Sequence, residues 1–144
     1  PIDSDSPGSL TEEQVIEICK SAKVQFLGNR SDLQDILAKT HIFVLPSYYA
    51  EGMPKVLLEA AASGCAVITT DHPGCRDAII PGETGMLVAP KDIPSLINTL
   101  ASLLSDRDLM ESMGKAGRQL AVQRFCITKV VDIHYSLYHT LRKD

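Results

Sequence analysis

The sequence from residue 42 to residue 71 reads IFVLPSYYAEGMPKVLLEAAASGCAVITTD. It opens with the apolar run 42–45, which is typical of a strand buried on both faces of a parallel sheet. The strong helix formers of 55–63 predict a helix, and Gly64 offers its C-terminal cap. A second apolar run, 66–69, predicts another buried strand. The stretch therefore predicts a strand, a loop, a helix and a strand, which is the repeating unit of an α/β fold.

Two carboxylates in this unit are candidate ligand-binding groups. Glu51 and Glu59 are separated by seven residues, one before the predicted helix and one inside it. Glu51 lies in a loop after a strand, where open α/β sheets bind their ligands. Pro54 suits a first helical position, and the helix start attracts an anionic phosphate by about 0.3–1 kcal/mol in an exposed site. Glu59 lies at least one turn farther along, so it is expected to project toward a neutral polyol such as a ribose.

Residues 51–60, EGMPKVLLEA, resemble the E-x7-E signature of the retaining glycosyltransferases of family 4, which have the GT-B fold. Other blocks resemble family motifs in the expected order: VQFLG at 24–28, FVLPS at 43–47, GCAVITT at 64–70, PGCRDAI at 73–79 and GETGMLV at 82–88. Two glutamates at one spacing occur by chance in many helices, but ordered blocks over most of the chain do not. The resemblance implies an α/β fold with a Rossmann-like parallel sheet and helices on both faces, most of one half of a GT-B fold.

The resemblance also implies site residues. Glu51 is expected to be the catalytic residue, bonded to hydroxyls of the donor sugar, and Glu59 to hold the ribose hydroxyls. The remaining residues would line the sugar through their backbone (Gly52, Met53, Pro54), donate N–H groups to the diphosphate (Val56, Leu57) or lie near the nucleobase (Asn29, Arg30, Leu33).

Alternatives remain for these residues. Glu51 either positions the donor and stabilises charge, which we prefer, or acts as the nucleophile of a double displacement. In a purely structural interpretation Glu51 caps the helix start, Glu59 is a solvated surface residue and Arg30 is an ordinary loop cation.

Family 4 enzymes transfer a sugar from a nucleotide sugar to an acceptor hydroxyl with retention of configuration at the anomeric carbon, and they need no metal ion. The resemblance therefore implies no metal site and no cofactor. Pro54 and Lys55 resemble members that assemble capsule, O-antigen or other lipid-linked glycans. That suggests hexosyl transfer from a UDP-sugar to a glycan or lipid-linked acceptor, in the cytoplasm and at the inner face of the cytoplasmic membrane through a longer parent protein.

The expected organisation is a leader or loop over 1–9, an incomplete donor-binding domain over 10–124 and a C-terminal helix over 125–144. GT-B enzymes begin with an acceptor domain, and their second domain opens with a strand and helix whose cations grip the diphosphate. Neither precedes residue 24, so we expect the acceptor domain to be missing and the isolated chain to be inactive. The main alternative is a non-catalytic nucleotide-binding or interaction module of the same fold. A sugar-nucleotide epimerase is a further alternative. A phosphorylase would need a pyridoxal-binding lysine motif, and a response-regulator receiver would need an acidic cluster and a phosphoacceptor aspartate; we find neither in the sequence.

Composition fits one globular domain: 144 residues, 44% hydrophobic and 22% charged. The net charge of −4 argues against a nucleic-acid partner. The four cysteines have no metal-ligand spacing, so we interpret them as reduced thiols, with a disulfide between Cys65 and Cys75 as the alternative. The other expected elements are a helix capped by Ser9 or Thr11, a strand at 24–27, helices at 33–39 and 77–80, a strand at 86–88, and helices at 91–104, 107–123 and 125–142.

Overall fold

The computed structural model describes residues 10–49 and 52–142. The chain divides into two compact units, Pro1–Leu33 and Gln34–Asp144. In the first, α1 spans Glu12–Ala22 and begins at a capping box. The Gln14 amide donates to Thr11 Oγ1 (3.3 Å), and the Thr11 amide donates to Gln14 Oε1 (2.8 Å). Of the two expected caps, Thr11 is therefore the one observed.

The predicted strand at 24–27 is wrong. These residues have no regular secondary structure, and the side chains of Val24, Phe26 and Leu27 are exposed. A strand is stable only where a neighbouring strand pairs with its N–H and C=O groups. The described part of the first unit contains no other strand. The apolar residues at 24–27 therefore lack, within the described part of this unit, the partner strand that they would require.

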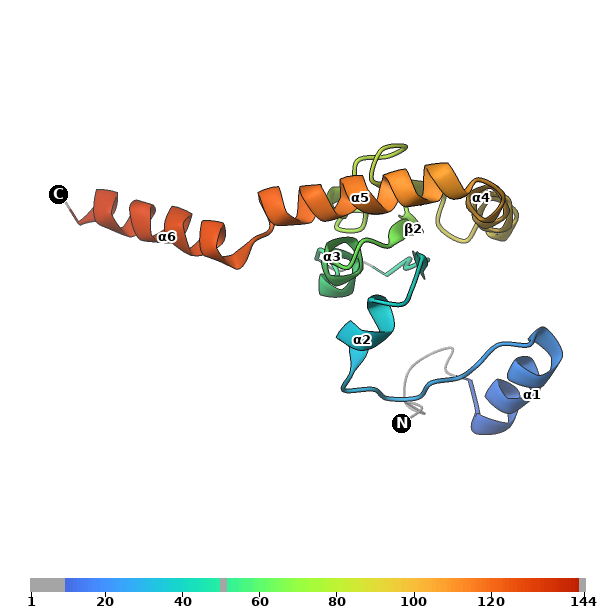
Figure 1. Ribbon diagram of the computed structural model, residues 1–144. Helices are drawn as coiled ribbons and strands as arrows, with labels where there is room; N and C mark the ends of the chain where they lie inside the picture. The colour runs from blue at the N-terminus through green and yellow to red at the C-terminus, as the bar shows by residue number, and fades with distance from the viewer. Residues whose placement is uncertain (1–9, 50–51, 143–144) are drawn as a thin grey trace. The chain divides into compact units, whose positions relative to one another are not determined.

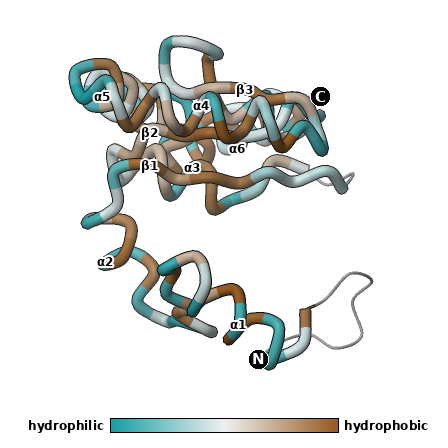
Figure 2. Tube along the Cα trace, turned by 90° about the vertical axis from the view of Figure 1, so that its right-hand side faces the viewer, coloured by the Kyte–Doolittle hydropathy of each residue, from teal (hydrophilic) through white to brown (hydrophobic). Residues whose placement is uncertain are grey.

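The second unit is built on a parallel sheet of three strands in the order β1-β2-β3. These are β1, Ile42–Leu45, β2, Ala66–Thr70, and β3, Gly85–Val88. Central β2 is buried along its whole length, with Ile68 opposite Val44 on one side and Met86 on the other. Figure 2 shows the hydrophobic run through β1. The strands predicted from residues 42–45 and 66–69 are confirmed.

Helices cover both faces of this sheet (Figure 1). On one face, α3 (Lys55–Ala62) packs Leu57 against Val67. On the other, α4 (Ile93–Ser105) packs Leu103 beside Ile68. The long α5 (Arg107–Arg124) contributes to both cores. The predicted α/β class, a Rossmann-like parallel sheet between helices, is confirmed.

Two glycines of α5 allow it to lie close to the sheet. A Cβ on Gly114 would lie 2.1 Å from the Gly64 carbonyl oxygen, and one on Gly117 would lie 3.4 Å from the Thr84 carbonyl oxygen. Gly64 itself follows α3 with φ of +85°, and its amide donates to Ala61 O (2.9 Å). This left-handed conformation at the end of a helix favours glycine, so the predicted cap is confirmed.

Several boundaries differ from the predicted ones. The helix α2 covers Leu33–Leu37 only, and the helix predicted at 77–80 is a single 3₁₀ turn, η1, at Arg76–Ala78. The last helix, α6, spans Ile127–Leu141, and it has no buried residue. Its exposed apolar side chains include Ile127, Ile133, Leu137, Tyr138 and Leu141. No helix in the described ranges combines the length and apolar character needed to cross a bilayer.

Candidate functional site

The loop before α3 and the helix itself carry most of the expected site. Glu51 lies outside the described residues, so its expected catalytic and capping roles stay predictions. Gly52 and Met53 are exposed, whereas Pro54 is half-buried. Pro54 is the N-cap of α3, with φ −64° and ψ 120°, and not its first helical residue as expected. The extended ψ explains the difference, because the chain turns into the helix only after Pro54.

Of the two N–H groups expected to bind the diphosphate, that of Leu57 already has an acceptor at the start of α3. The Leu57 amide donates to Pro54 O (3.0 Å), and the Leu57 side chain is fully buried in the core. Leu57 would therefore have to share its N–H to bind a phosphate. Val56 is half-buried beside it. Pro54 makes no side-chain capping bond. Among the described residues, no side chain therefore caps the start of α3.

Glu59 lies one turn into α3 and is half-buried, with 31% of its side chain exposed. Its Oε1 lies 3.1 Å from Nζ of Lys55, whose own side chain is 87% exposed. An exposed helical pair of this spacing contributes about 0.3–0.5 kcal/mol. The lysine can therefore move aside at little cost. Glu59 is neither the freely solvated residue of the structural interpretation nor a buried core residue.

Two depressions meet at Glu59. One, of about 360 Å³, is lined by Gln34, Ala38, Glu59, Ala62, Ser63 and Arg118. The other, of about 420 Å³, is more apolar and is lined by Lys55, Leu58, Glu59, Ala62, Ala121, Val122, Phe125, Cys126 and Ile127. A carboxylate at the rim of such a depression can accept hydrogen bonds from neighbouring hydroxyls of a polyol. The arrangement suits binding and orientation of a ligand.

Sequence reasoning missed Arg118, which lies beside Glu59 in the more polar depression. Its Nη1 donates to Ala62 O (2.7 Å), so the guanidinium also stabilises the end of α3. Arg118 is 59 positions from Glu59 in the chain. Only the packing of α5 across α3 brings the two together. No local pattern in the sequence signals this contact.

The three residues expected near a nucleobase all belong to the first unit. Arg30 pairs with Asp32, with Nε 2.7 Å from Oδ1 and Nη2 2.5 Å from Oδ2. The hydrogen bond to Asp32, and then the charge of that carboxylate, raise the pKa of Arg30 above its ordinary value. Leu33 is partly exposed, and Asn29 lies in the same loop. The role of Asn29, Arg30 and Leu33 beside a base stays a prediction.

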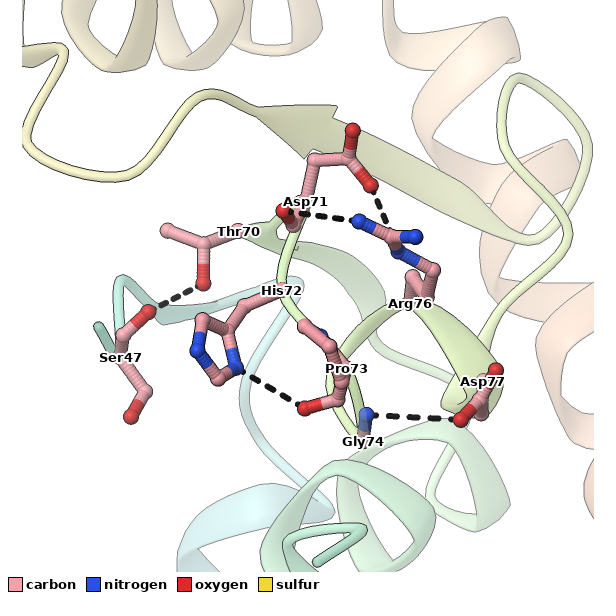
Figure 3. A network of polar contacts seen from close by, with 8 residues as sticks. All are labelled: Ser47, Thr70, Asp71, His72, Pro73, Gly74, Arg76 and Asp77. Carbon is pink, nitrogen blue, oxygen red and sulfur yellow. Dashed lines mark hydrogen bonds and ion pairs between the residues drawn. The ribbon is translucent and has the colours of Figure 1, made fainter. Parts of the chain in front are cut away.

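A network of polar contacts shapes the loop after β2 (Figure 3). Arg76 Nε lies 2.8 Å from Asp71 Oδ1, and its Nη2 donates to Asp71 O (3.2 Å). The Gly74 amide donates to Asp77 Oδ2 (3.4 Å), so Asp77 stabilises the turn between β2 and η1. The Thr70 hydroxyl donates to Ser47 O, and it thereby joins the loops that follow β2 and β1. The carboxyl edge of the sheet is fixed by these bonds.

The cysteines are free thiols, so the alternative disulfide between Cys65 and Cys75 is not formed. Both side chains are fully buried, and Cys65 Sγ lies 3.3 Å from Thr40 O. Burial raises the pKa of the Cys65 thiol. Within the ranges 10–49 and 52–142, no three His, Cys, Asp or Glu side chains are grouped as metal ligands. Independence from metal stays a prediction.

With this geometry in view, the chain can be placed among known proteins by its sequence. Residues 9–120 match the family model described as "Glycosyl transferases group 1". Because this match covers most of the chain, the chain belongs to that family. The relatives include bacterial glycosyltransferases of capsule and lipopolysaccharide synthesis.

Two relatives are similar over most of this chain. The N,N'-diacetylbacillosaminyl-diphospho-undecaprenol alpha-1,3-N-acetylgalactosaminyltransferase of Campylobacter jejuni is 38% identical over 75% of this chain and 28% of its own length. The UDP-Gal:alpha-D-GlcNAc-diphosphoundecaprenol alpha-1,3-galactosyltransferase of Escherichia coli is 36% identical over 81% of this chain and 30% of its own length. The chain therefore spans less than a third of either relative.

A solved structure shows the same fold. Sucrose-phosphate synthase from Thermosynechococcus elongatus superposes with a TM-score of 0.83 at 27% identity, over 98% of this chain and 37% of that protein. The structural neighbours are GT-B glycosyltransferases, and the expected relation to part of a GT-B fold is confirmed.

Proposed function

We propose that this chain is the donor-binding part of a retaining glycosyltransferase of family 4, which transfers a hexose from a UDP-sugar to a glycan or lipid-linked acceptor. The observation that carries the proposal is Glu59, a half-exposed carboxylate on α3 at the rim of two depressions. Its one ion pair in the described residues is with a highly exposed lysine, so the carboxylate is accessible to a ligand hydroxyl. Membership of the group 1 family supports the same activity.

Each site residue has a role in this proposal. Glu59 accepts hydrogen bonds from the ribose, and Val56 donates its N–H to the diphosphate, with Leu57 sharing the N–H that also serves Pro54. Glu51 accepts hydrogen bonds from hydroxyls of the donor sugar, and the backbone of Gly52 and Met53 lines that sugar. The helix start supplies positive dipole rather than a metal ion to the diphosphate. Neither a metal nor another cofactor is part of this mechanism.

The names of the relatives support the choice of donor and acceptor. The E. coli relative is named for UDP-Gal, and both relatives are named for acceptors on diphospho-undecaprenol. Both are also named for alpha-1,3 bonds, which fits retention when the donor bond is itself alpha. We propose a polyprenyl-diphosphate-linked acceptor for the parent protein, bound at the cytoplasmic face of the membrane with the help of an acceptor domain. The isolated chain is expected to bind nucleotide and to transfer no sugar.

The test is a two-dimensional amide NMR titration of the chain with UDP, GDP and ADP. UDP is expected to shift the signals of residues 28–33 and 52–59 more strongly than the purine nucleotides. Glu59→Gln removes the ribose contact, while Glu83→Gln removes an exposed carboxylate in the turn before β3 and serves as the control. Equal shifts with all three nucleotides would leave the UDP assignment without support.

The alternative function, a non-catalytic nucleotide-binding module, predicts the same titration but no transfer by the longer parent protein. Incubation of that parent with UDP-hexoses and a polyprenyl-diphosphate-linked sugar separates the two. Product with an alpha bond supports the transferase, and UDP binding without any product supports the module.

A further inference from the structure

A third depression lies at the carboxyl edge of the sheet. It has a volume of about 260 Å³ and is lined by Pro46, Tyr48, Thr70, Val88, Ala89, Lys91, Asp92, Ile93 and Leu96, which we call the Lys91 pocket. Its walls come from the ends of all three strands and from the start of α4. Ligands of open α/β sheets bind at this edge. The volume is slightly below the roughly 300–1,000 Å³ of drug-sized sites, so it suits a small group.

The pocket lining is mostly apolar. Pro46, Val88, Ala89, Ile93 and Leu96 supply aliphatic surface. The Thr70 hydroxyl is already bonded to Ser47 O, and the Asp92 carboxylate accepts the Ser95 amide (3.0 Å) as the N-cap of α4. These two polar groups therefore have partners. Lys91 is the one cation of this lining, and Asp92 is its one carboxylate.

Lys91 occupies a position where glycine is favoured. The Asp92 amide donates to Ala89 O (3.2 Å), which closes a turn with Pro90 second and Lys91 third. The φ of Lys91 is +64°, as a type II turn requires at its third residue. Proline suits the second position of such a turn, but a residue with a side chain is strained at the third. Strain of this kind at a non-glycine residue is common at ligand sites.

Lys91 is an exposed residue of the pocket lining. Lys91 Nζ lies 4.8 Å from the centre of the Tyr48 ring. Among the described residues it has no ion pair within 4.0 Å. Tyr48 is in turn held by Tyr49, whose ring centre is 4.4 Å away. The result is a largely apolar cavity whose lining includes one ammonium group, of Lys91, and one carboxylate, of Asp92, which also caps α4.

We propose that the Lys91 pocket binds the acceptor lipid at the junction of its diphosphate and its isoprenoid chain, with Lys91 on the diphosphate and the first isoprene carbons in the cavity. This inference rests on the proposed function, which supplies a polyprenyl-diphosphate-linked acceptor. It adds an acceptor contact to a unit for which we have proposed donor binding only. A branched hydrocarbon joined to a strong anion matches a largely apolar cavity with one cation in its lining.

The probe is geranyl diphosphate, a soluble short relative of the proposed lipid, added to the full chain and followed by amide NMR. We expect shifts at residues 88–96 and at Tyr48. Inorganic pyrophosphate and geraniol, each carrying half of the ligand, are expected to bind at least about tenfold more weakly. Equal affinity for pyrophosphate would show a simple anion site, and equal affinity for geraniol would show a simple apolar site. Either result overturns the proposal.

Lysine variants test the cation. Lys91→Gln is expected to weaken the binding of geranyl diphosphate by at least about tenfold, because it removes a hydrogen bond between charged groups. Lys115→Gln, at an exposed position on α5, is the control and should bind normally. Lys91→Gly gives the turn its favoured residue, so the melting temperature should rise while binding is lost. That combination separates a ligand role from a structural one. Unchanged binding by both Lys91 variants overturns the proposal.

A third variant tests the cavity wall. Ile93→Ser alters an apolar residue that is 65% exposed, so the fold should tolerate it. It should weaken the binding of geranyl diphosphate and leave the binding of pyrophosphate unchanged. Shifts confined to the exposed apolar residues of α6, or no shift at residues 88–96 at millimolar ligand, would leave the pocket as a packing surface for protein and overturn the proposal.

UDP added to the same samples keeps the two proposals apart. Shifts near Glu59 with UDP but none near Lys91 with geranyl diphosphate overturn the acceptor pocket alone. The reverse pattern overturns the donor site and supports the pocket as a prenyl-diphosphate site.

Discussion

Gly114 of α5 lies against the carbonyl oxygen of Gly64, which follows α3, so closely that a Cβ on Gly114 would be 2.1 Å from that oxygen. This approach brings α5 over β2 and α3, and it places Arg118 beside Glu59. The position of the candidate site therefore depends on a glycine far from it in the sequence.

Gly114→Ala is expected to destabilise the chain by about 1–3 kcal/mol, because the helix must move away from a backbone oxygen that cannot yield. Urea unfolding followed by circular dichroism measures the change. Gly117→Ala is the matched control, since its Cβ would lie 3.4 Å from the nearest oxygen and the helix gains propensity. Equal stability of the two variants would contradict the close contact.

Asp106 begins α5, and its Oδ1 accepts the Leu109 amide at 2.9 Å. Asp106→Ala should cost about 0.5–2 kcal/mol of stability, whereas Asp106→Asn should cost little because asparagine caps equally well. Both values come from urea midpoints at neutral pH. A large loss in the asparagine variant would mean that charge, not capping, dominates at this residue.

Glu111 bonds to Arg107 (Nε to Oε1, 2.7 Å), and the hydrogen bond, and then the charge of Arg107, lower the pKa of Glu111. A carboxyl with a lowered folded-state pKa stabilises the fold above its unfolded pKa. That contribution is lost as the pH falls through the lower folded value. NMR titration should give a midpoint below the ordinary 4.5. Arg107→Gln should raise that midpoint, and an unchanged midpoint would show that the pair does not persist in solution.

The cysteines should differ in reactivity. Cys126 is half-exposed, and its hydrogen bond to Thr128, Sγ to Oγ1 3.5 Å, lowers the pKa of the thiol. Cys65 and Cys75 are fully buried, and burial raises the pKa of Cys65. Iodoacetamide near pH 7.5 should therefore modify Cys126 well before either buried cysteine. Mass spectrometry of timed samples checks the order. Faster labelling of Cys65 would contradict the core packing of β2 and α2.

The unit at residues 42–71 could be predicted from the sequence because its signals are local. Two apolar runs, a stretch of helix formers and a glycine in the left-handed region each determine their own element. The strand at 24–27 could not be predicted correctly, since a strand depends on a partner that the local pattern does not contain. Pro54 shows the same limit on a smaller scale. Its fixed φ suits both an N-cap and a first helical residue, and ψ decides between them.

The candidate site also contains both kinds of residue, those predicted from a local pattern and those brought together by the fold. Glu59 was found from its spacing and from the family motif. Arg118 and the Lys91 pocket arise from contacts between distant segments. Pro90 is a local indication of the turn that gives Lys91 its left-handed φ. A glycine at position 91 would have predicted that turn, but the residue there is a lysine.

The most direct test of the account is the dissociation constant of UDP for the wild-type chain, Glu59→Gln and Lys55→Gln. The proposed ribose contact predicts that Glu59→Gln binds at least about tenfold more weakly, because hydrogen bonds to a charged group are lost. Lys55→Gln breaks the same ion pair but leaves the carboxylate, so it should bind as well as wild type or better. If both variants bind UDP like the wild type, Glu59 does not hold the ribose, and the central claim is wrong.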